Sequence, residues 1–382
     1  MENFVYHNPV KLVFGKGSIA QLANLIPPQA RVLMTCGGGS IRKNGVYDQV
    51  KAALARHSVA EFGGIEPNPR YETLMRAVQL CREQPADFLL SVGGGSVLDG
   101  TKFIALAIGY SKGDPWEILS RRAPVAEAIP LGCVLTLPAT GSEMNSFAVI
   151  SRESTHEKLA LENPLVYPRF SILDPETTFT LPDRQTANGV ADAFAHVMEQ
   201  YMTFPADAPL QDRQAEALLA TLVQEGPKAL RHPRDYAVRA NLMWAATQAL
   251  NGIIACGVPQ DWTTHGIGHE LTALYGLDHA QTLVALMPAV WKHQKAAKQA
   301  KLIQYGERIW GIRQGADLAG QAIDQTEKFF RSLGMKTRLS EYGIGADRFA
   351  EIADRFAGRG FRLGEHQSIG PREIVEILQL AL

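Results

Sequence analysis

Short apolar runs alternate with helix-like segments through the first 180 residues of the chain. Runs of this length that are apolar throughout are typical of buried strands, and the segment 97–109 has the apolar spacing of a helix. This alternation predicts β-α units arranged around a mainly parallel sheet. The expected strands include residues 31–36, 87–92, 132–137 and 170–174.

The pattern changes near Phe179, after which apolar residues recur at spacings of three and four. That spacing predicts helices, and no later apolar run has the quality of a strand. The Pro- and Thr-rich stretch 173–186 marks the boundary. We therefore predict an α/β domain over residues 1–179 and an all-helical domain over residues 180–382. The expected helices cover residues 187–202, 210–230, 241–255, 300–312, 323–334 and 347–358.

Composition and charge narrow the possible partners. The chain has 382 residues, 46% of them hydrophobic and 20% charged, which suits a globular protein with two cores. A net charge of −1 argues against nucleic acid as a partner, because phosphate binding needs a basic surface. Four widely spaced cysteines predict a reducing compartment. With no signal-peptide pattern and no apolar run of roughly 18–20 residues, we expect a cytoplasmic protein with no membrane partner.

A cluster of three glycines and a serine, residues 93–96, follows one expected strand directly and precedes a helix. Glycine lets the backbone approach a ligand closely, and the first N–H groups and the dipole of a helix favour an anion. This geometry suits a pyrophosphate bound by Gly94, Gly95 and Ser96, although the G-x-G-x-x-G fingerprint is absent. A flexible linker is the alternative, and the buried strand before the glycines argues against it.

Polar side chains near this cluster are further candidates for contact with a nucleotide. Two of them lie one turn apart on the helix after the glycines, where an ordinary surface pair is the alternative. Three hydroxyls lie in the turn-rich stretch 136–142, where a tight loop that caps a helix at Glu143 is the alternative. The candidates are Asp99, Lys102, Thr136, Thr140 and Ser142.

The other glycine cluster, residues 37–40, bears on the choice between NAD and NADP. Enzymes that bind the ribose 2′-hydroxyl of NAD usually place an acid at the end of a neighbouring strand. This place holds no carboxylate here, whereas a serine hydroxyl, Arg42 and Lys43 are nearby. The cluster therefore favours NADP, and a plain turn with solvated charges is the alternative. The predicted contacts are Gly37, Gly38, Gly39 and Ser40.

Histidines and acids in the helical part suggest a bound divalent cation. Asp192, His196 and Glu199 form a polar stripe at i, i+4 and i+7, and an Asp–His pair one turn apart can hold one cation. His265, His269 and His279 follow within fifteen residues. Burying several imidazoles without a partner is costly, and a dication would remove that cost.

Two ligand sets are open from spacing alone. His265 and His269, one turn apart, form the obvious chelating pair. In the other set His279 is a ligand and one of the earlier two histidines is not. Four protein ligands leave room for a substrate oxygen, whereas five would close the site.

The chain resembles the iron-containing (group III) alcohol dehydrogenase family over nearly its full length. Within the family it is most similar to the NADPH-dependent aldehyde reductase and butanol dehydrogenase branch. The stretches that carry the resemblance are the G-G-G-S-x-x-D-x-x-K motif at 93–102, P-A-T-G-S-E at 138–143, residues 188–200, and the three-histidine stretch at 265–279.

The resemblance implies a role for each candidate residue. It implies that the metal ligands are Asp192, His196, His265 and His279, with His269 beside the metal as a catalytic residue facing nicotinamide and substrate. It implies that the nicotinamide end of the cofactor lies near Asp99. NAD-using members carry an Asp where this chain has Gly38, which agrees with NADP. The implied cofactor contacts are Asn68, Gly95, Ser96, Thr136, Thr140 and Lys158.

The expected function is reversible, metal-dependent reduction of aldehydes to primary alcohols by NADPH, in a cleft between the two domains. One oxygen and three nitrogen ligands suit either Fe²⁺ or Zn²⁺. We expect a homodimer that acts on a small aldehyde or alcohol. A lyase of the dehydroquinate synthase type and a non-catalytic nucleotide and metal sensor are the alternatives. The lyase would need basic residues around an acidic substrate, and the residues near His265 are mostly apolar or hydroxylic.

The glycine cluster at residues 37–40 leads to a test of cofactor preference. Gly38→Asp should place a carboxylate against the 2′-phosphate and shift the preference from NADPH toward NADH, because the two negative charges repel. The ratio of kcat/KM for the two cofactors measures the shift. An unmodified protein that uses both cofactors equally would contradict this interpretation of the cluster.

Overall fold

The computed structural model describes residues 1–382 and divides into two compact units. The sheet unit comprises His7–Pro182 and His232–Thr247, and the helical unit comprises Met1–Tyr6, Asp183–Arg231 and Gln248–Leu382. The units therefore do not follow the single division at 179/180 expected from sequence. The first six residues belong to the helical unit, and one later segment belongs to the sheet unit. The predicted cleft between the two domains stays a prediction.

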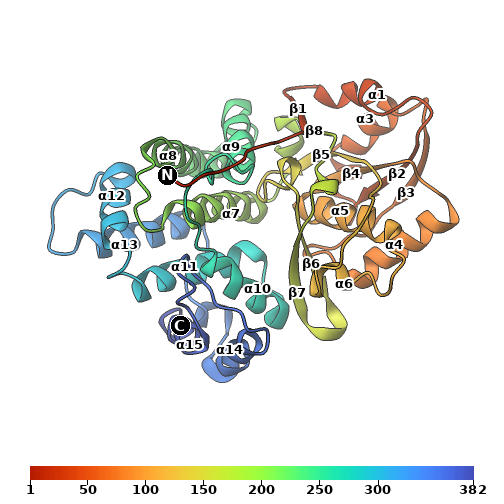
Figure 1. The fold of residues 1–382 in the computed structure, drawn as a ribbon. Coiled ribbons are helices and arrows are strands. Elements are labelled where there is room, and N and C mark those ends of the chain that lie inside the picture. Colours follow the sequence, from red (N-terminus) through yellow and green to blue (C-terminus); the bar gives the residue numbers. More distant parts are fainter. The chain divides into compact units, whose positions relative to one another are not determined.

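A six-stranded sheet, parallel throughout, forms the centre of the sheet unit (Figure 1). The strand order is β1-β8-β5-β4-β2-β3. The inner strands are apolar on both faces because helices cover both faces, as is usual for parallel sheets. The strands are β1 (Lys11–Phe14), β2 (Arg31–Cys36), β3 (Ser58–Phe62), β4 (Phe88–Gly94), β5 (Leu131–Leu137) and β8 (Phe170–Leu173).

Alternate residues of each strand point to two different cores. On β2, Val32 and Met34 contribute to the core under α1 and α3, whereas Leu33 contributes to the core under α4 and α5. This alternation follows from the two-residue period of a strand. The helices of this unit before β5 are α1 (Leu22–Leu25), α2 (Ser40–Lys43), α3 (Val46–Ala53), α4 (Tyr71–Glu83), α5 (Gly95–Gly109) and α6 (Glu117–Ser120).

The strand order brings the candidate nucleotide residues to one edge of the sheet. The glycine clusters follow β2 and β4, which are paired in parallel, and the stretch 138–142 follows β5, the other neighbour of β4. After β2 the chain proceeds to β3 on one side, and after β4 it proceeds to β5 on the other. Ligands of open α/β sheets bind where successive connections diverge in this way, outside the carboxyl ends of the strands.

Several elements of the sheet unit were not expected from sequence. Strands β1 and β3 are short and only partly buried, so they lack a clear apolar run. An antiparallel hairpin of β6 (Phe147–Arg152) and β7 (Glu157–Glu162) forms a second, two-stranded sheet. The helix considered at Glu143 is only a short 3₁₀ turn, Ser142–Met144.

The helical unit is organised around α7, whose residues from Thr186 to Tyr201 are all buried. The Phe194 ring of α7 lies 5.4 Å from the rings of Phe329 and Phe330 on α13. No helix in the structure has both the length and the apolar content required to cross a membrane. The helices are α7 (Asp183–Tyr201), α8 (Pro209–Arg231), α10 (Thr263–Tyr275), α11 (His279–His293), α12 (Gln299–Trp310), α13 (Leu318–Ser332), α14 (Phe349–Gly358) and α15 (Pro371–Leu380).

The contacts of helix α9 (Tyr236–Ala249) explain why the segment His232–Thr247 belongs to the sheet unit. The Thr247 hydroxyl lies 2.6 Å from the carboxyl group of Glu143, and Trp244 contacts Phe14 of β1 edge-on at 6.2 Å. Apolar spacing predicted a helix over residues 241–255, which agrees with α9 over 241–249 but missed its first five residues and continued past its end. It could not indicate that the helix packs with the sheet unit, because spacing identifies a buried face but not its neighbour.

Candidate functional site

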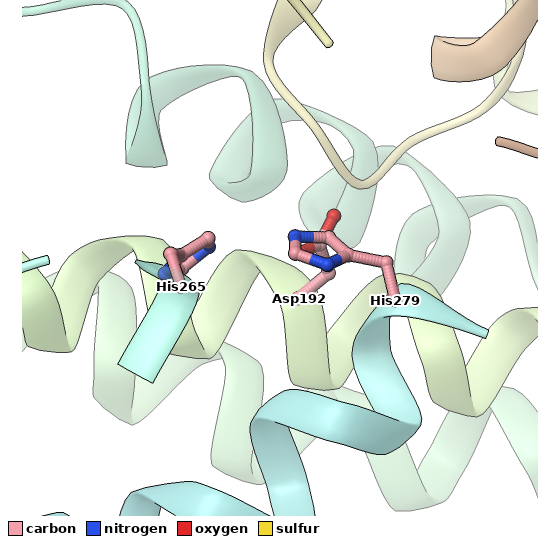
Figure 2. A group of neighbouring side chains, drawn as sticks. All are labelled: Asp192, His265 and His279. Atoms are coloured by element: carbon pink, nitrogen blue, oxygen red, sulfur yellow. The ribbon is translucent and has the colours of Figure 1, made fainter. Parts of the chain in front are cut away.

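Three helices of the helical unit bring one carboxylate and two imidazoles together. Asp192 comes from α7, His265 from α10 and His279 from the first turn of α11 (Figure 2). One potential ligand atom of each lies within 4.8 Å of the others. Asp192 and His265 are buried and His279 is partly buried, so a cation here would be largely shielded from water.

His196 lies beside this group, one helical turn after Asp192. Its Nε2 is 3.8 Å from Asp192 Oδ1, the same distance that separates His279 Nε2 from that oxygen. Its ring also stacks on that of His265 at 4.8 Å between centroids. The structure therefore gathers all four residues that the resemblance implies as ligands.

The chemistry of these side chains fits a divalent transition metal. Asp192 Oδ1 is buried and takes part in no hydrogen bond, which is unusual for a charged oxygen. A buried carboxylate needs a cationic or hydrogen-bonding partner, and a divalent ion supplies one. One carboxylate oxygen with three imidazole nitrogens is a donor set found for both zinc and iron.

The start of α11 is held in place by a network that reaches α7. Asp278 caps the helix, and its side chain and that of Gln281 form a reciprocal capping box. Asn188 of α7 donates a hydrogen bond to Asp278 Oδ2 at 2.8 Å. His279, the first residue of α11, is therefore placed relative to Asp192 by local capping and one contact between helices.

The start of α10 is held from α7 by Glu199 and from the segment just before the helix by Asp261. Asp261 Oδ1 accepts a hydrogen bond from Thr263 N at 2.8 Å. Glu199 Oε1 accepts from His265 N at 2.9 Å and lies 3.0 Å from His265 Nδ1. Burial raises the pKa of Glu199 to about 8, and the charge of Asp261 acts in the same direction.

His269 lies close to the metal candidates but outside the compact group of three. Its ring centroid is 5.1 Å from that of His279 and 6.5 Å from that of His265. The compact group contains His279 in place of His269. The geometry therefore favours the ligand set with His279 over the chelate of His265 and His269.

In the sheet unit, the glycine cluster at residues 93–96 is close-packed against the loop after β5. A Cβ at Gly95 would collide with the side chain of Thr140, and a Cβ at Gly93 would lie 2.6 Å from Val97. Only glycine therefore allows the backbone at the start of α5 to lie so close to the 138–142 loop. Thr136 is buried at the end of β5, below this loop.

Asp99 and Lys102 of α5 are both buried, so they are not a surface pair. Asp99 accepts hydrogen bonds from Ser142 Oγ at 2.7 Å and Val149 N at 2.9 Å. Burial raises the pKa of Asp99, whereas burial lowers the pKa of Lys102 to about 8 against the opposing charge of Asp99.

Lys102, one of the predicted cofactor contacts, is surrounded by acceptors of its own chain. Its ammonium donates to the backbone oxygens of Ser142, Asn145 and Phe147 and to Asn145 Oδ1, at 2.7 to 3.1 Å. These four acceptors engage it fully within the chain. Lys102 therefore holds the 142–147 segment in position, and its contact with the cofactor stays a prediction.

Asn68 and Lys158 were predicted as cofactor contacts only because of the family resemblance. Both lie next to the glycine cluster at residues 93–96. Lys158 Nζ of β7 donates to Asn68 Oδ1 at 2.8 Å, and Asn68 N donates to Ser96 Oγ at 3.3 Å. Asn68 has a left-handed backbone conformation, φ 55°, which asparagine tolerates better than most residues. Contacts within the chain therefore link the segments that carry Asn68, Ser96 and Lys158.

An acidic residue from another strand lies beside the glycine cluster at residues 37–40. Gly38 has open space around its Cβ position, and Gly39 has φ 102°. Arg42, however, is paired with Glu61 of β3 at 2.9 Å and stacks on the ring of Tyr47 at 3.9 Å. Residues 37–43 hold no carboxylate, as expected, but the carboxylate of Glu61 on β3 lies next to Arg42. Glu61 is remote in sequence and comes close because β3 pairs with β2.

Comparisons with known proteins agree with both units. The family model described as iron-containing alcohol dehydrogenase matches residues 9–175, and its C-terminal counterpart matches residues 186–382. The chain is 56% identical to NADPH-dependent aldehyde reductase YqhD of Escherichia coli, with 97% of each chain covered. A crystal structure of YqhD superposes with a TM-score of 0.98 at 55% identity, covering 100% of this chain and 99% of that one.

Two further relatives differ in the cofactor that their names state. NADP-dependent alcohol dehydrogenase 3 of Entamoeba histolytica is 43% identical, with 99% of this chain and 98% of that protein covered. Probable NADH-dependent butanol dehydrogenase 1 of Bacillus subtilis is 40% identical, with both chains covered in full. The resemblance and the architecture expected from sequence are thus confirmed: the chain belongs to the iron-containing alcohol dehydrogenase family.

Proposed function

We propose that this protein catalyses the reversible reduction of aldehydes to primary alcohols with NADPH and one divalent metal ion, Fe²⁺ or Zn²⁺. The observation that carries the proposal is the buried group of Asp192, His265 and His279, with His196 beside it, in a chain of this family. The 56% identity to NADPH-dependent aldehyde reductase YqhD supports the choice of substrate class and cofactor.

The residues of the helical unit would bind and orient the aldehyde. When bound, a divalent cation supplies Lewis-acid stabilisation of negative charge that develops on a carbonyl oxygen. Asp192, His196, His265 and His279 are its proposed ligands, and with four protein ligands a position stays open for the substrate. Asp192, His196 and His265 are buried and His279 is partly buried, so little water would reach the site and each electrostatic interaction there would be strengthened.

The residues of the sheet unit would bind the cofactor, which supplies hydride as reduced nicotinamide. We propose that the backbone at Gly94, Gly95 and Ser96 binds the pyrophosphate, because α5 is a helix of fifteen residues whose free N–H groups favour an anion. The loop after β2, with Gly37, Gly38, Gly39 and Ser40, would take the ribose 2′-phosphate. Asn68, Thr136, Thr140 and Lys158 are the other proposed contacts, and Asp99 would lie at the nicotinamide end and keep Ser142 oriented.

Nothing in the family assignment supports the alternatives of a dehydroquinate synthase-type lyase or a non-catalytic sensor.

All four cysteines are free and buried, which supports the proposal that the protein acts in the cytoplasm. The expected homodimer stays a prediction.

Purified, metal-loaded protein mixed with NADPH and butanal should consume NADPH steadily, measured by the loss of its absorbance. The same mixture without butanal is the control for slow oxidation. Tight nucleotide binding with no consumption, for butanal and for longer and shorter aldehydes, would contradict the reductase and favour a sensor.

Asp192→Ala, His196→Ala and His279→Ala should each lose the metal on dialysis, and activity with it, because three ligands remain and the ion is less well neutralised. Metal analysis should fall from about one ion per chain, the number that one four-ligand site holds, toward none. Full metal content in His279→Ala would remove His279 from the ligand set and restore the chelate of His265 and His269.

His269→Ala should keep the metal and bind NADPH, but lose about 10²–10⁴-fold in kcat with a changed pH profile, because we propose that His269 holds the water that relays a proton. His293→Ala is the matched control, since His293 lies on α11 and is bonded to Glu376. Metal loss in His269→Ala would make His269 a ligand. A lower melting temperature with unchanged kcat per folded molecule would make it a structural histidine.

A further inference from the structure

Glu199 is a buried acid that the proposed mechanism does not use. It lies on α7 seven residues after Asp192 and three after His196, so all three side chains share one helix face. Its side chain is only 5% exposed. An acid so deeply buried must gain enough from its neighbours to offset the loss of water.

A single oxygen of Glu199 contacts two nitrogens of His265. Glu199 Oε1 accepts the backbone N–H of His265 at 2.9 Å and lies 3.0 Å from its ring Nδ1. A divalent cation bound at the site would favour the ionised form of Glu199, which can only accept, and in that form the contact places the ring proton of His265 on Nδ1. The other ring nitrogen, Nε2, is then the one with a lone pair for a cation.

We propose that Glu199 is a positioning residue that fixes the orientation and tautomer of His265 and strengthens metal binding through it. The proposal rests on the metal site of the proposed function. A carboxylate that accepts from a ligating imidazole keeps the ring from rotating and makes its metal-binding nitrogen more basic. Its negative charge also adds to that of Asp192, so that together they balance a divalent ion.

The surroundings hold the Glu199–His265 contact rigidly. Asp261 N donates to the backbone oxygen of Glu199 at 2.9 Å, which ties the segment before α10 to α7. Asp261 is in turn paired with Lys298 at 2.7 Å, and Lys298 is also paired with Glu365 at 2.8 Å. Lys298 and Asp261 are almost fully buried. Because the segment cannot shift easily, loss of the Glu199 side chain should remove the hydrogen bond that orients the ring of His265.

Two variants separate the charge of Glu199 from its hydrogen bonds. In Glu199→Gln the amide oxygen can still accept both N–H groups, but the negative charge is gone. In Glu199→Leu the charge and the hydrogen bonds are both lost, while the side chain keeps a similar volume. Glu270→Gln is the matched control, because Glu270 is a buried acid on α10, the helix of His265, but pairs with Arg355 and Arg359 instead.

The measurement is the Kd for Zn²⁺ of each metal-free protein by competition with a chromogenic chelator, together with the visible spectrum after loading with Co²⁺ and the melting temperature before loading. We expect Glu199→Gln to bind Zn²⁺ about 10-fold more weakly with a Co²⁺ spectrum of unchanged shape. We expect Glu199→Leu to bind up to about 100-fold more weakly with an altered spectrum. Glu270→Gln should match the unmodified protein in both.

The outcomes distinguish this role from the metal site itself. An unmodified protein that binds no Zn²⁺ would remove the proposed metal site, and the role of Glu199 with it. Tight binding by the unmodified protein and equal binding by Glu199→Gln and Glu199→Leu would overturn the positioning role alone. A lower melting temperature with an unchanged Kd would likewise overturn it, because Glu199 would then be only structural. If Glu199→Leu does not fold, the Kd of Glu199→Gln decides.

Discussion

The helical unit depends on one electrostatic constraint, the burial of the Asp192 carboxylate among imidazole rings. An ionised carboxylate loses several kcal/mol on leaving water, roughly the whole margin of stability of a domain. Asp192 Oδ1 receives no hydrogen bond in return. Structural zinc in small peptides binds with about 10–16 kcal/mol, so a cation at this position can more than offset the cost. The stability of the site and its chemistry therefore have the same source.

The need to bring imidazoles to this carboxylate explains the hydrogen bonds that hold the starts of α10 and α11. The capping box of α11 places His279, and Asn188 ties that helix start to α7. Glu199 holds the start of α10 and the ring of His265. His279 and His265 thus each have a support that reaches back to α7, the helix that carries Asp192 and His196. A site built in this way is already organised before a cation binds, which reduces the ordering cost of binding.

The sheet unit has a different constraint, the close packing of the backbone at Gly95 against the loop after β5. Because residue 95 is glycine, the side chain of Thr140 can pack against its backbone. The buried ammonium of Lys102 donates hydrogen bonds to backbone oxygens of the 142–147 segment. Asp99 balances that charge and orients Ser142. The polar groups under the loop therefore satisfy one another. The backbone N–H groups at the start of α5 are left as the most suitable donors to an anion.

The sequence by itself determined the class of fold, because a strand buried on both faces and a helix with one buried face leave different apolar periods. The strands at 31–36 and 132–137 and the helix that carries Asp192 and His196 were predicted in this way. Motifs with local geometry, such as glycines between a strand and a helix, were also predictable. Spacing could not choose between His269 and His279 or reveal that Glu61 pairs with Arg42. Nor could it show that Lys102 is buried or that Glu199 contacts His265. Only the tertiary structure decided these, because each depends on a contact between segments whose separation in the chain bears no relation to their distance in space.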